Sequence, residues 1–531
     1  MHLQKIPFRS AQAFSEFFLK YIEQQPELTP FYGRFPSVES FGEQIKEKSS
    51  AFPATTRAIL VESLQQQYKD IKLTPAVEQN ITALREANTF TVTTGHQLSV
   101  FTGPLYFVFK IATVIKACRE LKARYPKHHF VPVYWMASED HDYDEIKSFR
   151  LYGKKYTWET EQQGGVGRFH TKDFKKLLSE IPGDIKIFKD AYTQCATLAD
   201  AVRQYVNALF GAEGLVVIDA DRLELKQLLK PVMQDDLFAH TSFRIVSETN
   251  QKLEALGFHP QVNPREINFF YLDTQLRSRI EQQAEGFTVV DTPLRFTREE
   301  ILQKLESTPE VFSPNVILRP VYQEIILPNL AYVGGPAELV YWLELKGVFE
   351  HFRVPFPILL PRNFGLVIDG PTSRKMNHTR LRLDSFFQTK NDLFKHWVTQ
   401  HSEHDLSLEK TAKSMEVLFA EVQARSAKID PTLGPMTAAH AARMQKMIHA
   451  IEQKMMRAEK RRQSDGLRQV EAVKDALFPN GGLQERTDNF LNFFQTDPSF
   501  IRQLIAHFDP FDFQFHVMTY DDQKGTSKAV S

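Results

Sequence analysis

Short apolar runs recur through the first two thirds of the chain and predict the strands of one sheet. They contain many β-branched and aromatic residues and do not alternate with polar ones, which is typical of strands buried on both faces. Helical patterns lie between several of them, so the order of elements favours an α/β sheet with helices on both faces. The five runs are Phe90–Thr94, Phe130–Ala137, Leu215–Asp219, Leu330–Val333 and Phe356–Leu360.

Two segments interrupt this alternation, and we interpret them as insertions into the sheet domain. The segment near residues 150–213 is polar and contains Gly164-Gly165. The segment near residues 258–310 contains short strand-like runs separated by turns. We therefore predict a core domain over residues 1–375 that carries both insertions.

The last third of the chain changes to a heptad pattern. Two apolar stripes are interrupted by Asp430-Pro431 and Gly434-Pro435, which break a helix. The stripes consist of Leu408, Met415, Val422 and Ile429, and then of Met444, Ile448, Ile451, Met455 and Ala458.

This pattern predicts an antiparallel coiled-coil hairpin within residues 376–480, followed by a C-terminal helical tail over residues 481–531. The alternative is that each stripe packs on the body of the protein. An isolated hairpin would leave apolar surface bare, so we expect it to form a homodimer.

Composition limits the class of protein. Lysine plus arginine equals aspartate plus glutamate, at 65 each, which argues against a general nucleic-acid-binding protein. There is no uninterrupted apolar segment of a signal peptide at the N-terminus and no run long enough to cross a membrane, so we expect a cytoplasmic protein without membrane contact. The only cysteines are Cys118 and Cys195. Cys118 falls on the apolar stripe of a predicted helix, which favours a core residue over a nucleophile.

The first candidate site follows the first predicted strand, in TTGHQLSVFTGPLY. A strand leads into a short loop and then into a helix, and the free N–H groups of such a turn can bind phosphate or carboxylate. The alternative is a plain helix cap. The candidate substrate-binding residues here are Gly95, His96, Gln97, Thr102, Gly103, Pro104 and Tyr106.

A second strand-to-helix turn of the same kind occurs in LAYVGGPAELVYW. Glu338 falls in the first helical turn, where it can stabilise the helix N-terminus or bind a substrate ammonium or hydroxyl group. Arg319, just upstream, can pair with a carboxylate or phosphate, or form a surface salt bridge. The candidate substrate-binding residues of this part are Asn315, Arg319, Gln323, Gly334, Gly335, Pro336 and Glu338.

The third candidate site is the acidic stretch that directly follows the run Phe130–Ala137. Acids at the carboxyl end of a buried strand favour an amine ligand. We assign Glu139 to substrate binding, and Asp140, His141, Asp142 and Asp144 to catalysis. One alternative is a charged loop that caps the next helix. A His/Asp metal site is another, but the spacing matches no ligand signature, so we predict no metal ligands.

Taken together, GHQLSVFTGPLY, VPVYWMASEDHDYDEI, SPNVILRPVYQEIILP, AYVGGPAELVYW and the late PNGGLQER resemble the bacillithiol synthase family. Family members often have Gln where this chain has His96. The resemblance implies a Rossmann-like core with connecting insertions, a C-terminal coiled coil that makes a homodimer, and a ligase that joins cysteine to the amine of glucosaminyl-malate.

A free carboxylate and an ammonium do not condense in water, so the carboxylate must be activated. We expect ATP as the activating cosubstrate, with magnesium as its companion ion. In this hypothesis, the two glycine turns hold anionic groups, and the acids hold amines and accept a proton. The hypothesis requires the loops after Thr94, Ala137 and Val333 to open into one crevice. The alternative function is a non-catalytic dimeric scaffold or a nucleotide sensor with a Rossmann-like body.

Overall fold

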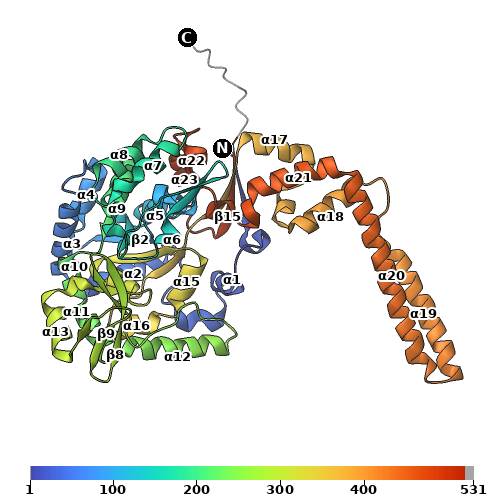
Figure 1. Cartoon of the computed structure of the whole chain (residues 1–531), viewed down its shortest axis with the longest axis horizontal. Helices are drawn as coiled ribbons and strands as arrows, with labels where there is room; N and C mark the ends of the chain where they lie inside the picture. Colours follow the sequence, from blue (N-terminus) through green and yellow to red (C-terminus); the bar gives the residue numbers. More distant parts are fainter. Residues whose placement is uncertain (1, 521–531) are drawn as a thin grey trace, which may run out of the picture.

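The protein is described from a computed structural model, which covers residues 2–520. Its centre is a five-stranded parallel sheet of order β13-β12-β2-β3-β6. With the strands counted along the chain, this is order 5-4-1-2-3, the Rossmann arrangement read from its other edge. Strand β2 of this sheet lies among the helices of the body (Figure 1). The prediction of an α/β Rossmann-like fold is confirmed, with each strand within two residues of its predicted bounds: β2 (Thr89–His96), β3 (His129–Met136), β6 (Val216–Asp219), β12 (Asn329–Gly334) and β13 (Ile358–Pro361).

The sheet is buried because its strands carry apolar or small residues at successive positions. Every residue of β2, β6, β12 and β13 is buried. Helix α5 (Tyr106–Arg124) packs on β2, β3 and β12, and it places Cys118 in the core as predicted. The other helices of the body are α1 (Glu16–Ile22), α2 (Ser40–Ala51), α3 (Ala54–Gln67), α4 (Pro75–Ala83), α6 (Tyr143–Ile146), α10 (Leu223–Lys226), α11 (Lys230–Phe238), α12 (Thr241–Ala255), α14 (Leu318–Ile326), α15 (Pro336–Leu343) and α16 (Lys346–His351).

Both predicted insertions are present as separate substructures. The first contains a hairpin of β4 (Ser148–Leu151) and β5 (Lys154–Thr157), followed by α7 (Phe174–Glu180), α8 (Lys186–Gln194) and α9 (Leu198–Phe210). The second is an antiparallel sheet of order β10-β9-β8-β7-β11, with α13 (Arg298–Ser307) between β10 and β11. Its strands are β7 (Phe269–Asp273), β8 (Leu276–Gln283), β9 (Gly286–Val289), β10 (Arg295–Phe296) and β11 (Phe312–Pro314).

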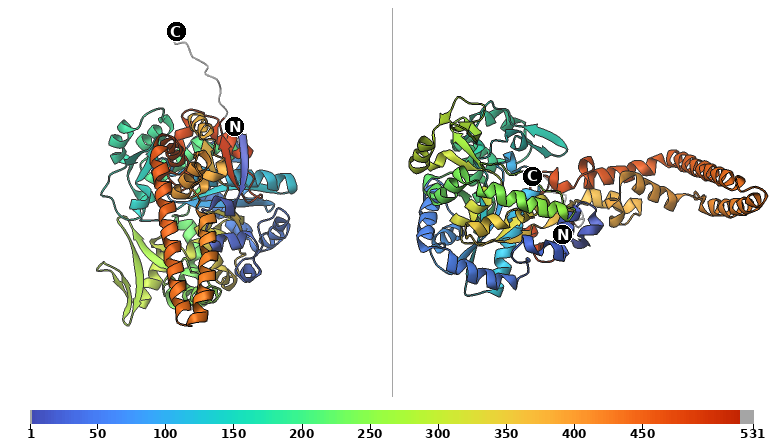
Figure 2. Two further views of the ribbon diagram at one scale, coloured as in Figure 1. Left: turned by 90° about the vertical axis from the view of Figure 1, so that its right-hand side faces the viewer. Right: turned by 90° about the horizontal axis from the view of Figure 1, so that it is seen from below.

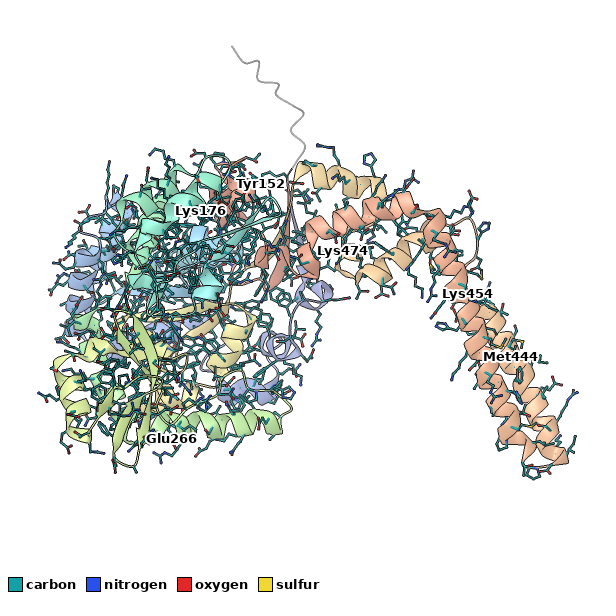
Figure 3. The ribbon with its side chains drawn as sticks, viewed as in Figure 1. Tyr152, Lys176, Glu266, Met444, Lys454 and Lys474 are labelled. Atoms are coloured by element: carbon teal, nitrogen blue, oxygen red, sulfur yellow. The ribbon has the colours of Figure 1, made fainter. Side chains whose placement is uncertain are left out.

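A helical arm projects from the body in the views of both Figure 1 and Figure 2. Its base consists of α17 (Gly370–Thr379), α18 (Lys390–His401) and α21 (Ser464–Leu477), and its outer part is the hairpin of α19 (Glu409–Ile429) and α20 (Leu433–Arg462). Met444 and Lys454 lie along the hairpin, whereas Lys474 lies at the base (Figure 3). The predicted coiled-coil hairpin is therefore present and does not lie flat on the body.

Only part of the first predicted stripe lies in the hairpin seam, the contact surface between α19 and α20. Leu408 and Met415 are partly buried, but Val422 is 44% exposed and Ile429 is 83% exposed. A strict seven-residue repeat drifts by about 20° per heptad on a straight helix, so it leaves the covered face after two or three heptads. On α20, Ile448 is buried but Ile451 is 51% exposed. Gly434-Pro435 lies in the first turn of α20 and does not break a helix.

The C-terminal segment returns from the arm to the body. It contains α22 (Leu491–Phe494), α23 (Phe500–His507) and strand β15 (Gln514–Thr519), so the predicted helical tail is only partly helical. Strand β15 lies between β1 (His2–Pro7) and β14 (Phe364–Ile368), which joins both ends of the described chain in one sheet. The part of the predicted tail after residue 520 lies outside the described residues. No helix among residues 2–520 has the length and apolar character to span a membrane.

Candidate functional site

A cavity of about 670 Å³ opens at the carboxyl ends of β2, β3 and β12. The chain runs outward from β2 to β3 and β6 on one side, and β12 and β13 lie on the other, so the strand order reverses between β2 and β12. Ligands of open α/β sheets bind at such a reversal. Gln97, Glu139 and Gly335 all line the cavity, which confirms that the three predicted loops open into one crevice.

Gly95 and Arg319 meet at the wall of this cavity. A Cβ atom at Gly95 would lie 3.3 Å from the Tyr332 hydroxyl oxygen and 3.8 Å from Arg319 Nη1. Glycine at the end of β2 therefore lets the guanidinium approach the strand. Arg319 Nη1 donates to Gln323 Oε1 at 3.1 Å, whereas its Nη2 makes no hydrogen bond of good geometry and has the Tyr341 hydroxyl as its polar neighbour. Gln323 itself is fully buried and acts on the cavity only by holding Arg319.

Aromatic rings enclose the Arg319 guanidinium. Its Cζ atom lies 5.7 Å from the ring centre of Trp135, 5.6 Å from that of Tyr332 and 6.0 Å from that of Trp342. The rings fix the plane of the guanidinium and exclude water from it, which strengthens its attraction to an anion. Arg319 is therefore held in place to bind an anion in the cavity.

Glu338 is already engaged within the protein. Its carboxylate accepts from Gly335 N at 2.7 Å and from the Tyr332 hydroxyl at 2.8 Å, and it pairs with Lys110 Nζ at 2.6 Å. Burial would raise the pKa of Glu338, but the Lys110 charge and these hydrogen bonds hold it below its usual range. The N-terminus of α15 is thus capped by its own carboxylate, and the Gly334–Pro336 turn is not a free anion seat.

Gly95, His96 and Gln97 line the cavity, but the later part of the predicted Gly95–Pro104 anion seat, Thr102–Pro104, does not. The C-terminal segment covers it: Asn489 Nδ2 donates to the carbonyls of Phe101 and Gly103 at 2.7 and 2.6 Å, and Leu105 N donates to Asp488 O at 2.7 Å. The N–H groups of Gly103 and Leu105 are therefore used within the fold, by the carbonyls of Val100 and Asp488. Asn315, Pro336 and Tyr106 line the cavity, whereas Gly334, the last residue of β12, does not.

The acidic stretch after β3 is divided by the structure. Glu139 and Asp140 line the cavity. Asp142 instead caps α6, where it accepts from Glu145 N at 3.2 Å. The Asp144 side chain is 80% exposed and pairs with Lys147. Asp142 thus fits the helix-capping alternative, and Asp144 is a solvent-exposed residue of the same short helix.

His141 also lies outside the main cavity. It lines a neighbouring cavity of about 440 Å³, and its Nδ1 is 2.9 Å from Arg277 Nη1. Arg277 borders both cavities and lies 3.6 Å from Asp140. Burial would raise the pKa of Asp140, but hydrogen bonds from His141 and Gln97 and the Arg277 charge hold it well below its usual range. Asp140 is therefore ionised and is a weak base.

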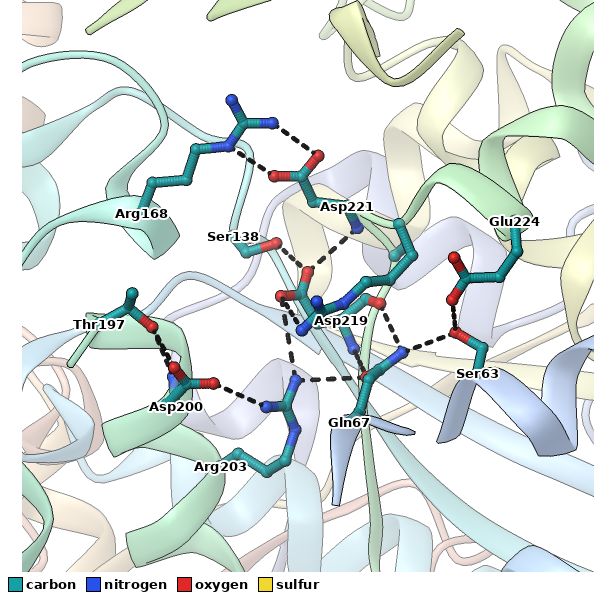
Figure 4. A network of polar contacts seen from close by, with 12 residues as sticks. Ser63, Gln67, Ser138, Arg168, Thr197, Asp200, Arg203, Asp219, Asp221 and Glu224 are labelled. Atoms are coloured by element: carbon teal, nitrogen blue, oxygen red, sulfur yellow. Dashed lines mark hydrogen bonds and ion pairs between the residues drawn. The ribbon is translucent and has the colours of Figure 1, made fainter. Parts of the chain in front are cut away.

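Glu139 has the opposite environment. It forms an ion pair with Lys226, whose side chain is fully buried. Burial raises the pKa of Glu139, and the Lys226 charge opposes this shift. The turn that carries Glu139 is held in place by the preceding residue, because Ser138 donates to Asp219. Asp219 belongs to a polar network that includes Arg203 and Gln67 (Figure 4).

Basic residues dominate the wall of the cavity. It is lined by seven basic side chains and three acidic ones, Glu139, Asp140 and Glu338. An excess of positive charge in an enclosed cleft favours an anionic ligand. The amine-selective acidic surface predicted from the sequence is thus a minor part of the site. The seven basic residues are Lys110, Arg265, Arg277, Arg279, Arg319, Arg362 and Arg486.

Comparison with known proteins gives the family. Residues 1–363 match the model described as "Bacillithiol biosynthesis BshC, N-terminal Rossmann-like domain", and residues 365–520 match "Bacillithiol biosynthesis BshC, C-terminal coiled-coil domain". The chain belongs to the BshC family. The family resemblance seen in the sequence motifs is therefore confirmed, as is the division into a Rossmann-like part and a coiled-coil part.

Similar proteins carry the name "Putative cysteine ligase BshC". The protein of Cytophaga hutchinsonii is 38% identical over 519 residues, which cover 98% of this chain and 99% of that protein. The protein of Flavobacterium johnsoniae is 38% identical over 97% of this chain and 99% of its own length. That of Salinibacter ruber is 30% identical over 92% of this chain and 93% of its own. These matches confirm the prediction of a ligase enzyme.

Sequence reasoning missed most of the basic wall. Arg362 directly follows β13, so the rule that sites lie at carboxyl ends of strands would have found it. Arg486 falls in PNGGLQER, one of the motifs shared with BshC proteins, but only the return of the C-terminal segment brings it to the cavity. Lys110 is a charged residue within the apolar stripe of α5. Arg265, Arg277 and Arg279 come from the second insertion and carry no local signal.

No group of three or more His, Cys, Asp or Glu side chains in residues 2–520 is arranged to hold a metal ion.

Proposed function

We propose that this protein joins the carboxyl group of cysteine to the amine of glucosaminyl-malate, forming an amide in the last step of bacillithiol synthesis. The observation that carries the proposal is the cavity at the strand-order reversal, with its four-charge basic excess and the unpartnered Nη2 of Arg319. The malate part of glucosaminyl-malate carries two carboxylates, and guanidinium groups bind carboxylates with matched geometry. The names of the related proteins support the same reaction class.

Activation of the cysteine carboxylate is assigned to ATP, which forms an acyl-adenylate with release of pyrophosphate or an acyl-phosphate with release of ADP. The amine then attacks the acyl carbon, and AMP or phosphate leaves as the amide forms and the amine loses a proton. Because the two helix N-termini are capped or covered, the arginines are the groups available for phosphate. Arg265, Arg279 and Arg486 line the cavity and are its candidates for this role. Magnesium would accompany ATP as its counter-ion.

Glu139 is the candidate acceptor of the amine proton. Burial raises its pKa, which makes it a stronger base than Asp140, whose pKa is lowered. General-base catalysis is most effective when the pKa of the base approaches the working pH. This assignment replaces His141, Asp142 and Asp144, which lie outside the main cavity.

The helical arm is assigned to assembly of a homodimer in the cytoplasm. Val417, Leu418, Ile429 and Met447 are each more than half exposed on the hairpin, and water-exposed apolar groups of this density favour a second helical surface. No nucleic acid partner is proposed, since the net charge of the chain is zero.

The decisive test is reconstitution. Purified protein is incubated with cysteine, glucosaminyl-malate and ATP, and the thiol product is measured by mass spectrometry. We expect a product that requires all three components, with AMP or ADP released in equal amount, and the nucleotide product distinguishes acyl-adenylate from acyl-phosphate. Calorimetry measures binding of glucosaminyl-malate separately. A folded protein that does not bind glucosaminyl-malate would overturn the proposal and favour the scaffold alternative.

A further inference from the structure

His96 has an imidazole whose tautomer is fixed by the backbone. Its Nδ1 lies 2.7 Å from the carbonyl oxygen of Gln97. A carbonyl oxygen can only accept, so Nδ1 carries the hydrogen and donates it. In the neutral ring, Nε2 then has a lone pair and no hydrogen.

The imidazole is neutral at physiological pH because of its surroundings. Burial lowers the pKa of His96 to about 4, and the nearby positive charge of Lys110 adds to this effect. The ring packs against Tyr106 and Phe107, with ring centres 5.3 and 5.0 Å apart, so it cannot turn freely. Nε2 is therefore a fixed hydrogen-bond acceptor.

This acceptor has no partner in the protein. His96 lines the cavity at the strand-order reversal and is only 9% exposed, and its Nε2 is buried without a hydrogen bond. Leaving a buried acceptor unpaired costs about 1–3 kcal/mol. Two donors of neighbouring wall residues, Arg319 Nη2 and Arg362 Nε, are also buried and unpartnered. The wall of the cavity thus has two unpartnered guanidinium N–H donors and one neutral acceptor, whereas Nη1 and Nη2 of Arg362 are taken by Glu485.

The charges around His96 select the kind of donor that it can accept. Lys110 and Arg362 both act to lower the pKa of the imidazole, so the same charges disfavour an ammonium group beside Nε2. An uncharged O–H or N–H group meets no such repulsion. Glu338 acts on the ring in the opposite direction, but its carboxylate is paired with Lys110, and the buried Glu485 is paired with Arg362, so neither carboxylate is free to hold an ammonium beside Nε2.

We propose that His96 Nε2 accepts a hydrogen bond from an uncharged hydroxyl or amine of the anionic substrate, and so orients that substrate beside the arginines of the wall. The inference rests on the proposed function for the identity of the substrate. If the donor is the amine, the contact holds the attacking nitrogen in its unprotonated, nucleophilic form. If the donor is a sugar hydroxyl, the contact positions the ring.

Two amide substitutions separate the acceptor from the rest of the ring. In His96→Asn, the side-chain amide can still donate to Gln97 O but does not reach the position of Nε2. In His96→Gln, the longer side chain places an amide oxygen near that position. Both variants are neutral and polar. His128→Asn is the matched control, because His128 lies just before β3, beside the ring of Phe90, and has an unpartnered buried Nδ1 away from the cavity.

The measurement is calorimetric titration of each folded full-length variant with glucosaminyl-malate. We expect His96→Asn to bind about three- to tenfold more weakly than the parent, the loss of one neutral hydrogen bond, and His96→Gln and His128→Asn to bind within about twofold of it. Repeating the titration in buffers of different ionisation enthalpy identifies the donor: binding through an amine releases a proton, and binding through a hydroxyl does not.

Three results would overturn the inference. His96→Asn binding as tightly as the parent would show that Nε2 contacts only an ordered water. His96→Gln binding as weakly as His96→Asn would show that the acceptor is not what matters. If the parent protein does not bind glucosaminyl-malate at all, the proposed function fails as well, so the two failures are distinguishable.

Discussion

Replacement of Arg319 tests whether the cavity binds an anionic substrate. Arg319→Met removes the charge but keeps much of the side-chain length between Trp135 and Tyr332, whereas Arg319→Lys keeps the charge and loses the planar fork. The guanidinium contributes an unpartnered Nη2 in a site that aromatic rings shield from water. A hydrogen bond between charged groups contributes about 1.5–3 kcal/mol. Its loss corresponds to an increase in Kd of about 10- to 140-fold.

The assay is calorimetric binding of glucosaminyl-malate, supported by product formation at saturating cysteine and ATP. We expect Arg319→Met to weaken binding across that range and Arg319→Lys to weaken it by about tenfold, because a lysine ammonium retains the Coulomb attraction but not the matched geometry. Arg319→Met also leaves the buried Gln323 oxygen without its donor, which costs about 1–3 kcal/mol of stability. Circular dichroism and a melting curve therefore accompany each titration.

The control for this experiment is Arg244→Met, since Arg244 is exposed on α12 and donates only to Thr241. A cooperatively folded Arg319→Met protein with a Kd within twofold of the parent would refute the assignment of Arg319 as an anion-binding residue. A loss of the same size in Arg244→Met would show that the change in affinity reflects net charge and not the site.

Three further changes follow from the same geometry. Glu139→Gln leaves Lys226 buried without a counter-charge, so we expect the free energy of unfolding in urea to fall by about 3–5 kcal/mol and product formation to be lost. Adding Lys226→Met restores most of the stability but not the activity. Asp142→Asn and Asp144→Asn leave product formation within about twofold, because these side chains cap α6 and face solvent. Burial raises the pKa of Asp236 to about 7, so between about pH 4 and 7 the folded state holds a proton that the unfolded state has lost. The free energy of unfolding in urea therefore falls as the pH rises over this range, and it falls less in Asp236→Asn.

Each of these expectations has an opposing result. Activity in the stable Glu139→Gln/Lys226→Met double variant would remove Glu139 as the proton acceptor. A tenfold loss of activity in a folded Asp144→Asn protein would return the exposed acids to the site. An identical pH dependence of stability in the parent and in Asp236→Asn would show that this carboxyl group does not take up a proton on folding.

The sequence by itself determined the elements and the end of the sheet at which ligands bind. Apolar runs such as Phe130–Ala137 form buried strands because other elements must cover both of their faces. The rule that ligands bind at the carboxyl ends of strands follows from the parallel topology. Gly95, Gln97 and Arg319 were therefore placed correctly in one crevice. The heptad pattern likewise predicted the hairpin, because its periodicity is a local property of each helix.

Only the tertiary structure decided the electrostatic character of the site. The C-terminal segment covers the turn Thr102–Pro104 and delivers Arg486, and the second insertion delivers Arg277, through contacts between residues hundreds of positions apart. No local pattern encodes such contacts, since the same loop sequence can face a cavity or a neighbouring segment. The exposure of Ile429 also needed the structure, because a seven-residue repeat stays in the seam of a supercoiled helix but drifts out of it on a straight one, and the repeat alone does not say which applies.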